Sequence, residues 1–360
     1  MTLFPKIKYF KRTFFKVCIF VCCLIFCINH VPILLYKANG IGNAANYVEG
    51  LAECVMELNS RRVLYERNGE LRLPMASTTK ILTATTVLDH IQNLDEIISV
   101  PPKAVGIEGS SVYLKEGDEY SIRDLLYGMM LRSGNDCATA LGLHVGGDIQ
   151  NFSKMMNLTA QKAGALHSHF VNPHGLPDGE HRTTARDLCY ITCYAMKNPI
   201  YRDIVSTQFY EPYGWKNKNK LLTIYKYANG GKTGYTKEAG RCLVSSAQKE
   251  NMTLICCVLN CATTYERSIN LFNDAFACYE NVKILAKEQP ITLEKNGKIY
   301  TACAKEDFYY PLLNDEKEFI QIKSIPINQF KNNVKKNEII GKFEIYFLKQ
   351  LLFSGNLYKL

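Results

Sequence analysis

The order of helical and strand-like patterns along the chain constrains its fold most strongly. Apolar residues recur at helical spacing in several segments between residues 77 and 196, whereas residues 47–68 and 241–261 alternate as strands do. Strands at both ends of a helical region can share a sheet only if the chain brings them together, with the helices packed around them. The pattern therefore predicts an α/β fold of the α+β kind with a mixed sheet.

Individual helices can be placed from the same periodicity. One helix is expected from Ser77 to Leu94. A second is expected before a break at Ser133–Gly134, and a third after it. Another begins near Thr183 or Thr184, after a loop rich in Pro and Gly, and a closing helix spans residues 263–287. The helical part of the chain is thus expected to be a cluster of several helices.

The chain is long enough for two domains, because it has 360 residues. After Pro290 the pattern changes to short alternating runs such as "ITLEKNGKIYTACA" and "GKFEIYFL". We therefore predict a catalytic domain over residues 46–287 and a small all-β domain over residues 288–360.

The N-terminal end has the composition of a signal peptide or a membrane anchor. Residues 1–48 contain six basic residues and no acidic one, and apolar runs occupy residues 17–28 and 31–36. Without those six, the chain has 43 − 6 = 37 basic against 34 acidic residues, so most of its +9 net charge lies at this end. The basic flank predicts export of the rest of the chain and gives no reason to expect a nucleic-acid partner. Residues 1–45 are predicted to be either cleaved or retained as an anchor.

The cysteines and histidines do not form a metal-binding pattern. The chain has fourteen cysteines but no C-x-x-C pair, and those outside the leader mostly lie in apolar segments, which predicts buried thiols. Four histidines cluster in one loop, but their spacing differs from the H-E-x-x-H arrangement of zinc peptidases. These are His167, His169, His174 and His181. We expect no cofactor and interpret this segment as a polar loop bordering a cleft.

The segment "PMASTTKILT" places Ser77 and Lys80 three residues apart at the start of a helix. Residues three apart lie on one helical face, so the lysine amine can reach the serine hydroxyl. A lysine that burial or a second cation keeps neutral can activate such a serine as a nucleophile. The alternative is an ordinary helix cap by Ser77. The same spacing at Ser246–Lys249 falls in a predicted hairpin, so the spacing alone is weak evidence.

Two further motifs decide between these interpretations. Ser133-Gly134-Asn135 lies at the expected helix break, and Lys232-Thr233-Gly234 leads into a strand. S-x-x-K, a serine motif and K-T-G in this order are the signature of penicillin-binding proteins and class A β-lactamases. With "FVNPHGLPDGEHRTTARDL" and "KTGYTKEAGRCLVSSA", the chain resembles the serine D-Ala-D-Ala carboxypeptidases from about residue 46 to its C-terminus. The resemblance implies an antiparallel sheet flanked by helices, an all-helical subdomain and a small all-β domain.

The resemblance also implies roles for the matching residues. Ser77 would attack the penultimate D-Ala carbonyl, with Lys80 as its base. Ser133 would relay protons, and Asn135 would hold the substrate backbone. Lys232 would add positive potential.

Residues at and after the lysine motif would complete the substrate site. Thr233 would bind the terminal carboxylate, and Gly234 would let the substrate approach the strand. The backbone N–H groups of Ser77 and Tyr235 would form the oxyanion hole. Arg267, in "TTYERS", occurs where the family often has an arginine for the carboxylate, and a solvated helix residue is the alternative.

Two positions depart from the family pattern, and both are expected to affect the packing of the strand beside the site. Gly231 replaces an apolar residue, and Arg241 replaces a residue that is commonly aromatic. The loop that carries a catalytic glutamate in class A β-lactamases has no glutamate here before Glu180, so efficient β-lactam hydrolysis is not expected.

The expected function is removal of the terminal D-alanine from peptidoglycan stem peptides through an acyl-enzyme, with β-lactams acylating the same serine. The alternatives are a non-hydrolytic, membrane-tethered β-lactam or peptidoglycan sensor, a DD-endopeptidase and a weak β-lactamase. The protein is expected outside the cytoplasm in the cell envelope. Any membrane attachment is expected through residues 14–36, because the C-terminal "GKFEIYFLKQLLFSGNLYKL" alternates like a strand.

Overall fold

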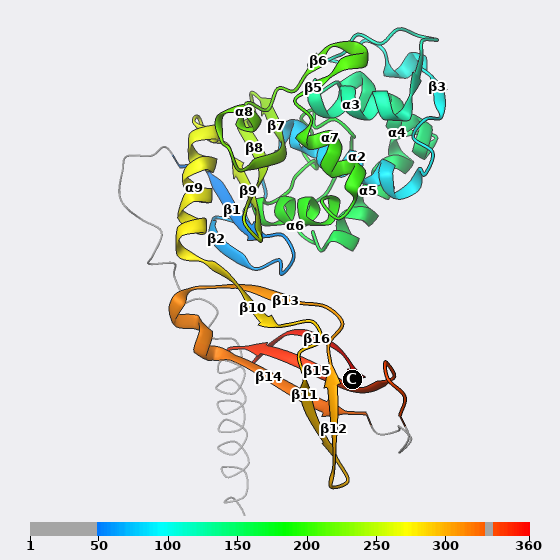
Figure 1. The fold of residues 1–360 in the computed structure, drawn as a ribbon. Helices are drawn as coiled ribbons and strands as arrows, with labels where there is room; N and C mark the ends of the chain where they lie inside the picture. The colour runs from blue at the N-terminus through cyan, green and yellow to red at the C-terminus, as the bar shows by residue number, and fades with distance from the viewer. Residues whose placement is uncertain (1–48, 328–333) are drawn as a thin grey trace, which may run out of the picture. The chain divides into compact units, whose positions relative to one another are not determined.

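The computed structural model describes residues 49–327 and 334–360. Its central feature is a five-stranded sheet in the order β2-β1-β9-β8-β7 (Figure 1). The strands are β1 (Ala52–Glu57), β2 (Val63–Arg67), β7 (Ala228–Thr236), β8 (Gly240–Lys249) and β9 (Met252–Leu259). Every neighbouring pair is antiparallel, so the mixed sheet predicted from the helical and strand patterns is wrong and the antiparallel sheet implied by the resemblance is confirmed.

Helices cover both faces of this sheet (Figure 1). On one face α6 packs on β1 and β9, and the other helices of the cluster surround α2; on the opposite face α9 packs on β8 and β9. The helices are α2 (Lys80–His90), α3 (Ile122–Leu131), α4 (Asn135–Gly146), α5 (Ile149–Ala163), α6 (Ala185–Ala195), α7 (Pro199–Ser206), the short α8 (Leu221–Ile224) and α9 (Thr264–Cys278). Two separate apolar cores result, one under the helix cluster and one under α9.

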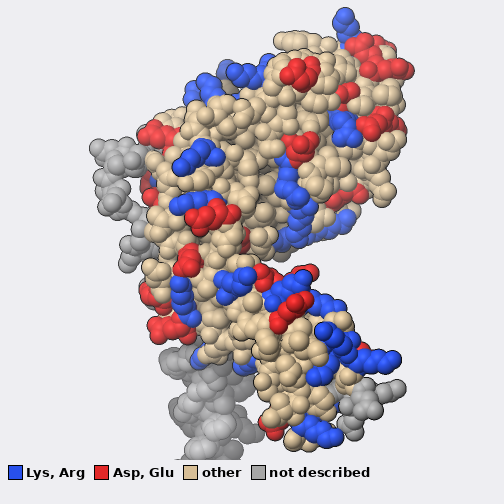
Figure 2. Space-filling model, in the orientation of Figure 1, with Lys and Arg blue, Asp and Glu red and all other residues tan. Residues whose placement is uncertain are grey.

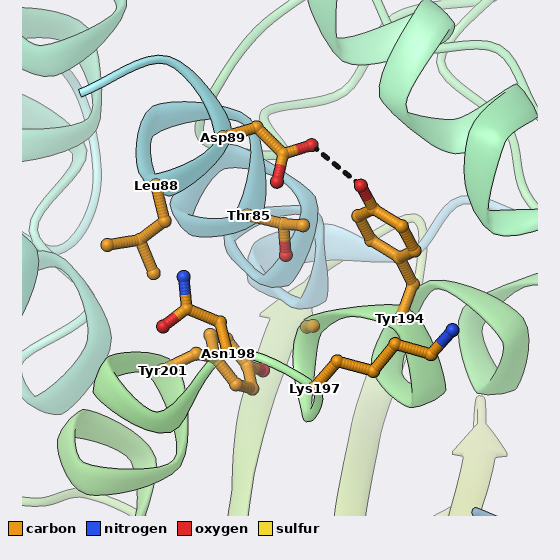
Figure 3. Close-up of a pocket in the computed structure, with 8 residues that line it drawn as sticks. Thr85, Leu88, Asp89, Tyr194, Lys197, Asn198 and Tyr201 are labelled. Atoms are coloured by element: carbon orange, nitrogen blue, oxygen red, sulfur yellow. Dashed lines mark hydrogen bonds between the residues drawn. The ribbon is translucent and has the colours of Figure 1, made fainter. Parts of the chain in front are cut away.

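The helix cluster carries two small hairpins at its periphery. They are β3 (Ile97–Ser99) with β4 (Glu119–Ser121), and β5 (Phe209–Tyr210) with β6 (Trp215–Lys216). A hollow of about 270 Å³ lies between α2 and the α6–α7 region. Figure 3 shows residues that line it, among them Asp89, which accepts a hydrogen bond of 3.1 Å from the Tyr194 hydroxyl. None of the residues predicted for the active site lines this hollow.

The C-terminal part of the chain is built from strands around a small apolar core of its own. A five-stranded antiparallel sheet has the order β11-β12-β16-β15-β14, and β10 pairs with β13. The strands are β10 (Glu280–Leu285), β11 (Ile291–Lys295), β12 (Lys298–Cys303), β13 (Phe308–Leu312), β14 (Ile320–Pro326), β15 (Ile339–Phe347) and β16 (Gln350–Lys359). The predicted boundary at residue 288 stays a prediction.

Two predicted helices have different limits in the structure. The helix expected from Ser77 begins at Lys80, because residues Ala76–Thr79 form a tighter 3-10 turn before it. The closing helix ends at Cys278, and Glu280–Leu285 is a strand that pairs antiparallel with β13.

The thiols predicted to be buried are confirmed as buried and free. They include Cys137, Cys189, Cys193, Cys242, Cys256 and Cys257. Burial raises the pKa of the Cys242 thiol to about 11, so it stays protonated at neutral pH. These side chains therefore act as small apolar groups of the core.

The surface of the described residues carries both signs of charge. On the face drawn in Figure 2, basic and acidic side chains are interspersed. The leader that holds most of the net positive charge lies outside the described residues. No helix within residues 49–327 and 334–360 combines the length and apolar character needed to cross a bilayer.

Candidate active site

Ser77 lies in the 3-10 turn that leads into α2. Side chains three residues apart eclipse one another in a 3-10 turn, which brings the lysine at the start of α2 over the serine. The distance from Lys80 Nζ to Ser77 Oγ is 3.0 Å. The predicted pair is therefore brought together, by a tighter turn than the predicted α-helix.

The Lys80 amine has two other partners, and both are hydrogen-bond acceptors. Nζ donates to Asn135 Oδ1 at 2.6 Å and to the His174 carbonyl oxygen at 2.7 Å. The Asn135 amide is itself oriented by its Nδ2, which donates to the Glu108 carbonyl at 2.5 Å. A charged amine would donate to all three oxygens, Ser77 Oγ included. In the neutral amine the two protons serve Asn135 and His174, and the lone pair is left for Ser77 Oγ. This is the arrangement that a general base requires.

The charge state of Lys80 agrees with this arrangement. Burial, followed by the nearby ammonium of Lys232, holds the pKa of Lys80 well below its ordinary value. None of the ion pairs among the described residues includes the Lys80 side chain, which is completely buried. Lys80 can therefore be neutral at a pH where an exposed lysine is charged.

The second pair joins the helix break to the edge of the sheet. Ser133, between α3 and α4, has a positive φ of 65°, and its Oγ accepts a hydrogen bond of 3.0 Å from Lys232 Nζ. Burial, with a smaller effect of the Lys218 ammonium, lowers the pKa of Lys232 to about 7. Ser133 is thus held by a lysine that changes its charge near neutral pH.

Strand β7 carries the lysine motif past the nucleophile. A Cβ added to Gly234 would lie 3.1 Å from the backbone nitrogen of Ser77 and 3.0 Å from the Met75 carbonyl oxygen. The absence of a side chain at Gly234 therefore lets β7 approach the backbone N–H of Ser77. Alternation along β7 puts Thr233 and Tyr235 on the opposite face from Lys232.

The two departures from the family pattern have structural consequences. Gly231 has a φ of 136°, and a Cβ there would lie 2.4 Å from the Val244 carbonyl oxygen, so the strand requires glycine at this position. Arg241 is exposed and stands directly opposite Tyr235 in the β7–β8 ladder, on the same face of the sheet as Thr233.

Arg267 does not join these residues, which corrects the prediction that it binds substrate. Its Nε and Nη2 donate to the two carboxylate oxygens of Glu53 at 2.8 and 2.7 Å, and Nη2 also donates to the Tyr65 hydroxyl at 3.0 Å. Only 8% of Arg267 is exposed, and Glu53 is completely buried. The guanidinium is therefore occupied by a carboxylate of β1.

Sequence reasoning missed two groups at the site. The His174 carbonyl, which accepts from Lys80, lies in "NPHGL", a loop quoted only as a family match. Lys218 donates to Ser110 Oγ at 3.1 Å and depresses the pKa of Lys232. No motif marks Lys218, and only its place among the three nearby lysines identifies it.

Comparisons with known proteins identify the family of this chain. The family model of the D-alanyl-D-alanine carboxypeptidases (peptidase family S11) matches residues 42–263, and that of the penicillin-binding protein 5 C-terminal domain matches residues 279–359. The chain is 26% identical over 328 residues to the D-alanyl-D-alanine carboxypeptidase DacF of Bacillus subtilis, which covers 87% of this chain and 83% of the relative. It is 35% identical over 219 residues to a Streptomyces D-alanyl-D-alanine carboxypeptidase, over 54% of this chain and 75% of that one.

Solved structures show the same relationship. Penicillin-binding protein 5 of Haemophilus influenzae superposes with a TM-score of 0.72 at 26% identity, covering 89% of this chain and 98% of that one. A Streptomyces K15 DD-transpeptidase mutant superposes with a TM-score of 0.61 at 32% identity, over 65% of this chain and all of that one. The two family models together cover most of the described residues, and both motif pairs lie within hydrogen-bond distance. The chain therefore belongs to the D-alanyl-D-alanine carboxypeptidase family of low-molecular-mass penicillin-binding proteins.

Proposed function

We propose that this chain removes the terminal D-alanine from peptidoglycan stem peptides through an acyl-enzyme on Ser77. Its family acts on peptidoglycan D-Ala-D-Ala peptides and binds β-lactams. The single observation that carries the assignment of the nucleophile is the Lys80 amine. It donates to Asn135 and to the His174 carbonyl, and it lies 3.0 Å from Ser77 Oγ.

In the acylation step, Ser77 Oγ attacks the carbonyl carbon of the penultimate D-Ala and its proton moves to Lys80 Nζ. The carbonyl oxygen gains a negative charge, which the N–H groups of Ser77 and Tyr235 stabilise. The C–N bond to the last D-Ala then breaks, and the leaving amine takes the proton that Lys80 had accepted, delivered through Ser133. Each of these groups acts on an atom that changes charge during the reaction.

In the second step water attacks the ester carbonyl of the acyl-enzyme. The proton of the water returns through Lys80, and the C–O bond to Ser77 breaks, which regenerates the serine hydroxyl. Recognition of the terminal carboxylate is assigned to Thr233, with Lys232 adding positive potential from the buried face of β7, since Arg267 is engaged by Glu53.

The test compares wild type with Ser77→Ala and with the matched control Ser246→Ala. Ser246 starts the other S-x-x-K sequence, and its buried hydroxyl has no hydrogen-bond partner among the residues that the structure describes. We expect wild type and Ser246→Ala to form an adduct with labelled penicillin, seen by mass spectrometry, and to release D-Ala from a pentapeptide. Ser77→Ala should lose about 10⁶-fold in D-Ala release.

The other outcomes separate the alternatives. A stable penicillin adduct without any D-Ala release would favour a non-hydrolytic sensor. Adduct formation by Ser77→Ala, or none by wild type, would contradict the assignment of the nucleophile.

Attachment to the membrane through residues 14–36 is a further part of this proposal. It is supported by the length and apolar character of that segment, which lies outside the described residues. A chain without residues 1–45 should fractionate with soluble protein, and its retention on membranes would defeat this part of the proposal alone.

A further inference from the structure

The residue before the nucleophile has an unusual backbone conformation. Ala76 has a φ of 50°, in the left-handed region that residues with a Cβ adopt rarely and at a cost of about 1–2 kcal/mol. Such a turn persists only where its surroundings hold it. Two side-chain hydroxyls bond carbonyls of this turn: Thr78 Oγ1 donates to Met75 O at 2.7 Å, and Thr79 Oγ1 donates to Ala76 O at 2.8 Å.

These two hydroxyls differ in whether they have a second hydrogen-bond partner. Thr79 Oγ1 is also 2.8 Å from His181 Nε2, whereas no second partner of Thr78 Oγ1 is found among the described residues. His181 Nδ1 accepts a hydrogen bond of 3.1 Å from the Val171 backbone nitrogen, so the ring proton is on Nε2 and is donated to Thr79. The hydrogen bonds therefore run in one direction, from the Val171 N–H through His181 and Thr79 to the Ala76 carbonyl.

The loop that carries His181 contacts the same turn at two further points. A Cβ on Gly175 would lie 1.9 Å from the Ala76 carbonyl oxygen, so this loop backbone lies directly against the turn. One residue earlier, the His174 carbonyl accepts from Lys80 at 2.7 Å. A displacement of the loop would thus move both the turn that carries Ser77 and an acceptor of its base.

The geometry points to His181 as a positioning residue. It acts through Thr79 to fix the position of the Ala76–Ser77 turn relative to the loop whose His174 carbonyl accepts from Lys80. His181 touches neither the nucleophile nor its base, so it is not a catalytic residue. The inference rests on the proposed role of Ser77.

The protonation state of His181 supports this role. Burial, opposed by Asp178 and reinforced by His169, Arg182 and Lys80, lowers the pKa of His181 to about 4. His174 faces it from the same loop, and its pKa is lowered to about 3, chiefly by burial. The imidazole is therefore neutral at neutral pH, as acceptance of the Val171 N–H by Nδ1 requires.

The test replaces one hydroxyl at a time in the full chain and measures the second-order rate of acylation by a fluorescent penicillin, with the melting temperature as the readout of folding. Thr79→Val should lower the acylation rate about tenfold to a hundredfold, because small displacements of reacting groups have effects of this size. Thr78→Val is the matched control: both threonines are completely buried and each bonds the carbonyl three residues earlier. It should lower the rate less than about threefold, with a similar loss of melting temperature.

Three further variants separate positioning from general stability. Thr79→Ser keeps the hydroxyl and should restore the rate to within about threefold of wild type. His181→Phe keeps a ring but removes the donor, and it should lower the rate as Thr79→Val does. The variant that combines Thr79→Val with His181→Phe should be acylated no more slowly than the slower of the two single variants, because both substitutions break the same hydrogen-bond chain.

The inference is overturned if folded Thr79→Val acylates at the wild-type rate, if Thr78→Val and Thr79→Val slow it equally, or if Thr79→Ser fails to restore it. If His181→Phe does not fold, the two threonine positions still decide the question. Failure of wild type to be acylated at all would instead overturn the proposed function.

Discussion

The buried basic side chains on the two faces of the central sheet differ in whether they have a carboxylate partner. On the face under the helix cluster, Lys80 and Lys232 are almost completely buried, and neither has a carboxylate partner among the ion pairs of the described residues. On the face under α9, the Arg267 guanidinium is buried against both oxygens of Glu53. Burial lowers the pKa of each lysine, whereas the Glu53 carboxylate raises the pKa of Arg267 above its ordinary value.

This difference distinguishes a stabilising charge from a reactive one. A buried cation with a carboxylate partner stays charged, and losing either partner leaves an uncompensated charge in the core. A buried lysine without such a partner loses its proton readily and can serve as a base. Burial of a basic residue therefore says little about function until its partner is known.

Replacing Lys80 should give the largest of the expected effects, a loss of activity without a comparable loss of stability. We expect Lys80→Met to lower kcat/KM for D-Ala release about 10²–10⁴-fold, because among the described residues Lys80 is the base found within hydrogen-bond distance of Ser77 Oγ. Its free energy of unfolding should change by less than about 1 kcal/mol, because relief of burying the amine offsets the lost hydrogen bonds. Steady-state kinetics and denaturant unfolding measure the two quantities, and a loss of stability above about 3 kcal/mol would place Lys80 in the same class as Arg267.

Replacing Arg267 should produce the reverse result. Arg267→Met leaves the buried Glu53 carboxylate without its cation and should lower the free energy of unfolding by about 3–5 kcal/mol. Adding Glu53→Gln should restore part of that loss, whereas the exposed neighbour control Arg241→Met should change stability by less than about 0.5 kcal/mol. The folded fraction should keep its KM. A rise in KM for carboxylate substrates without a loss of stability would revive the substrate role predicted for Arg267.

The smallest expected effect concerns the pH dependence of Lys232. Its pKa of about 7 means that it is charged below neutral pH and neutral above it, so attraction for a substrate carboxylate is lost as pH rises. KM for a peptide ending in D-Ala should therefore rise about tenfold between about pH 6 and pH 9, and KM for its C-terminal amide should not.

Two variants sharpen that measurement. Lys232→Arg stays charged and should remove the pH dependence. Lys218→Met removes the neighbouring positive charge, which raises the pKa of Lys232 and should move the increase in KM to higher pH. An unchanged profile in both variants would show that another group titrates.

Spacing and order along the sequence were enough to predict the groups that act at short range. Ser77 and Lys80 are separated by one turn, and Ser133 and Lys232 stand at a helix break and a strand edge that local patterns reveal. The exact start of the helix was missed, because the left-handed φ of Ala76 depends on a loop about 100 residues further along the chain.

The ion pair of Arg267 with Glu53 could not be predicted for a related reason. Its partner Glu53 lies 214 residues away, and which face of the sheet each occupies depends on the register of β1 against β9. Similarly, residues 280–285 continue an apolar pattern that suits either a helix or a strand. Only their pairing with β13 decides between the two.

Among the described strands, β7 has a neighbour on one side only, since the sheet order ends there. The outward amide and carbonyl groups of a terminal strand are free to pair with any extended polypeptide. A peptide lying along β7 would for a short time become a sixth strand, and hydrolysis would release it. We expect an extended backbone, more than any particular side chain, to be the common feature of the ligands that this protein accepts.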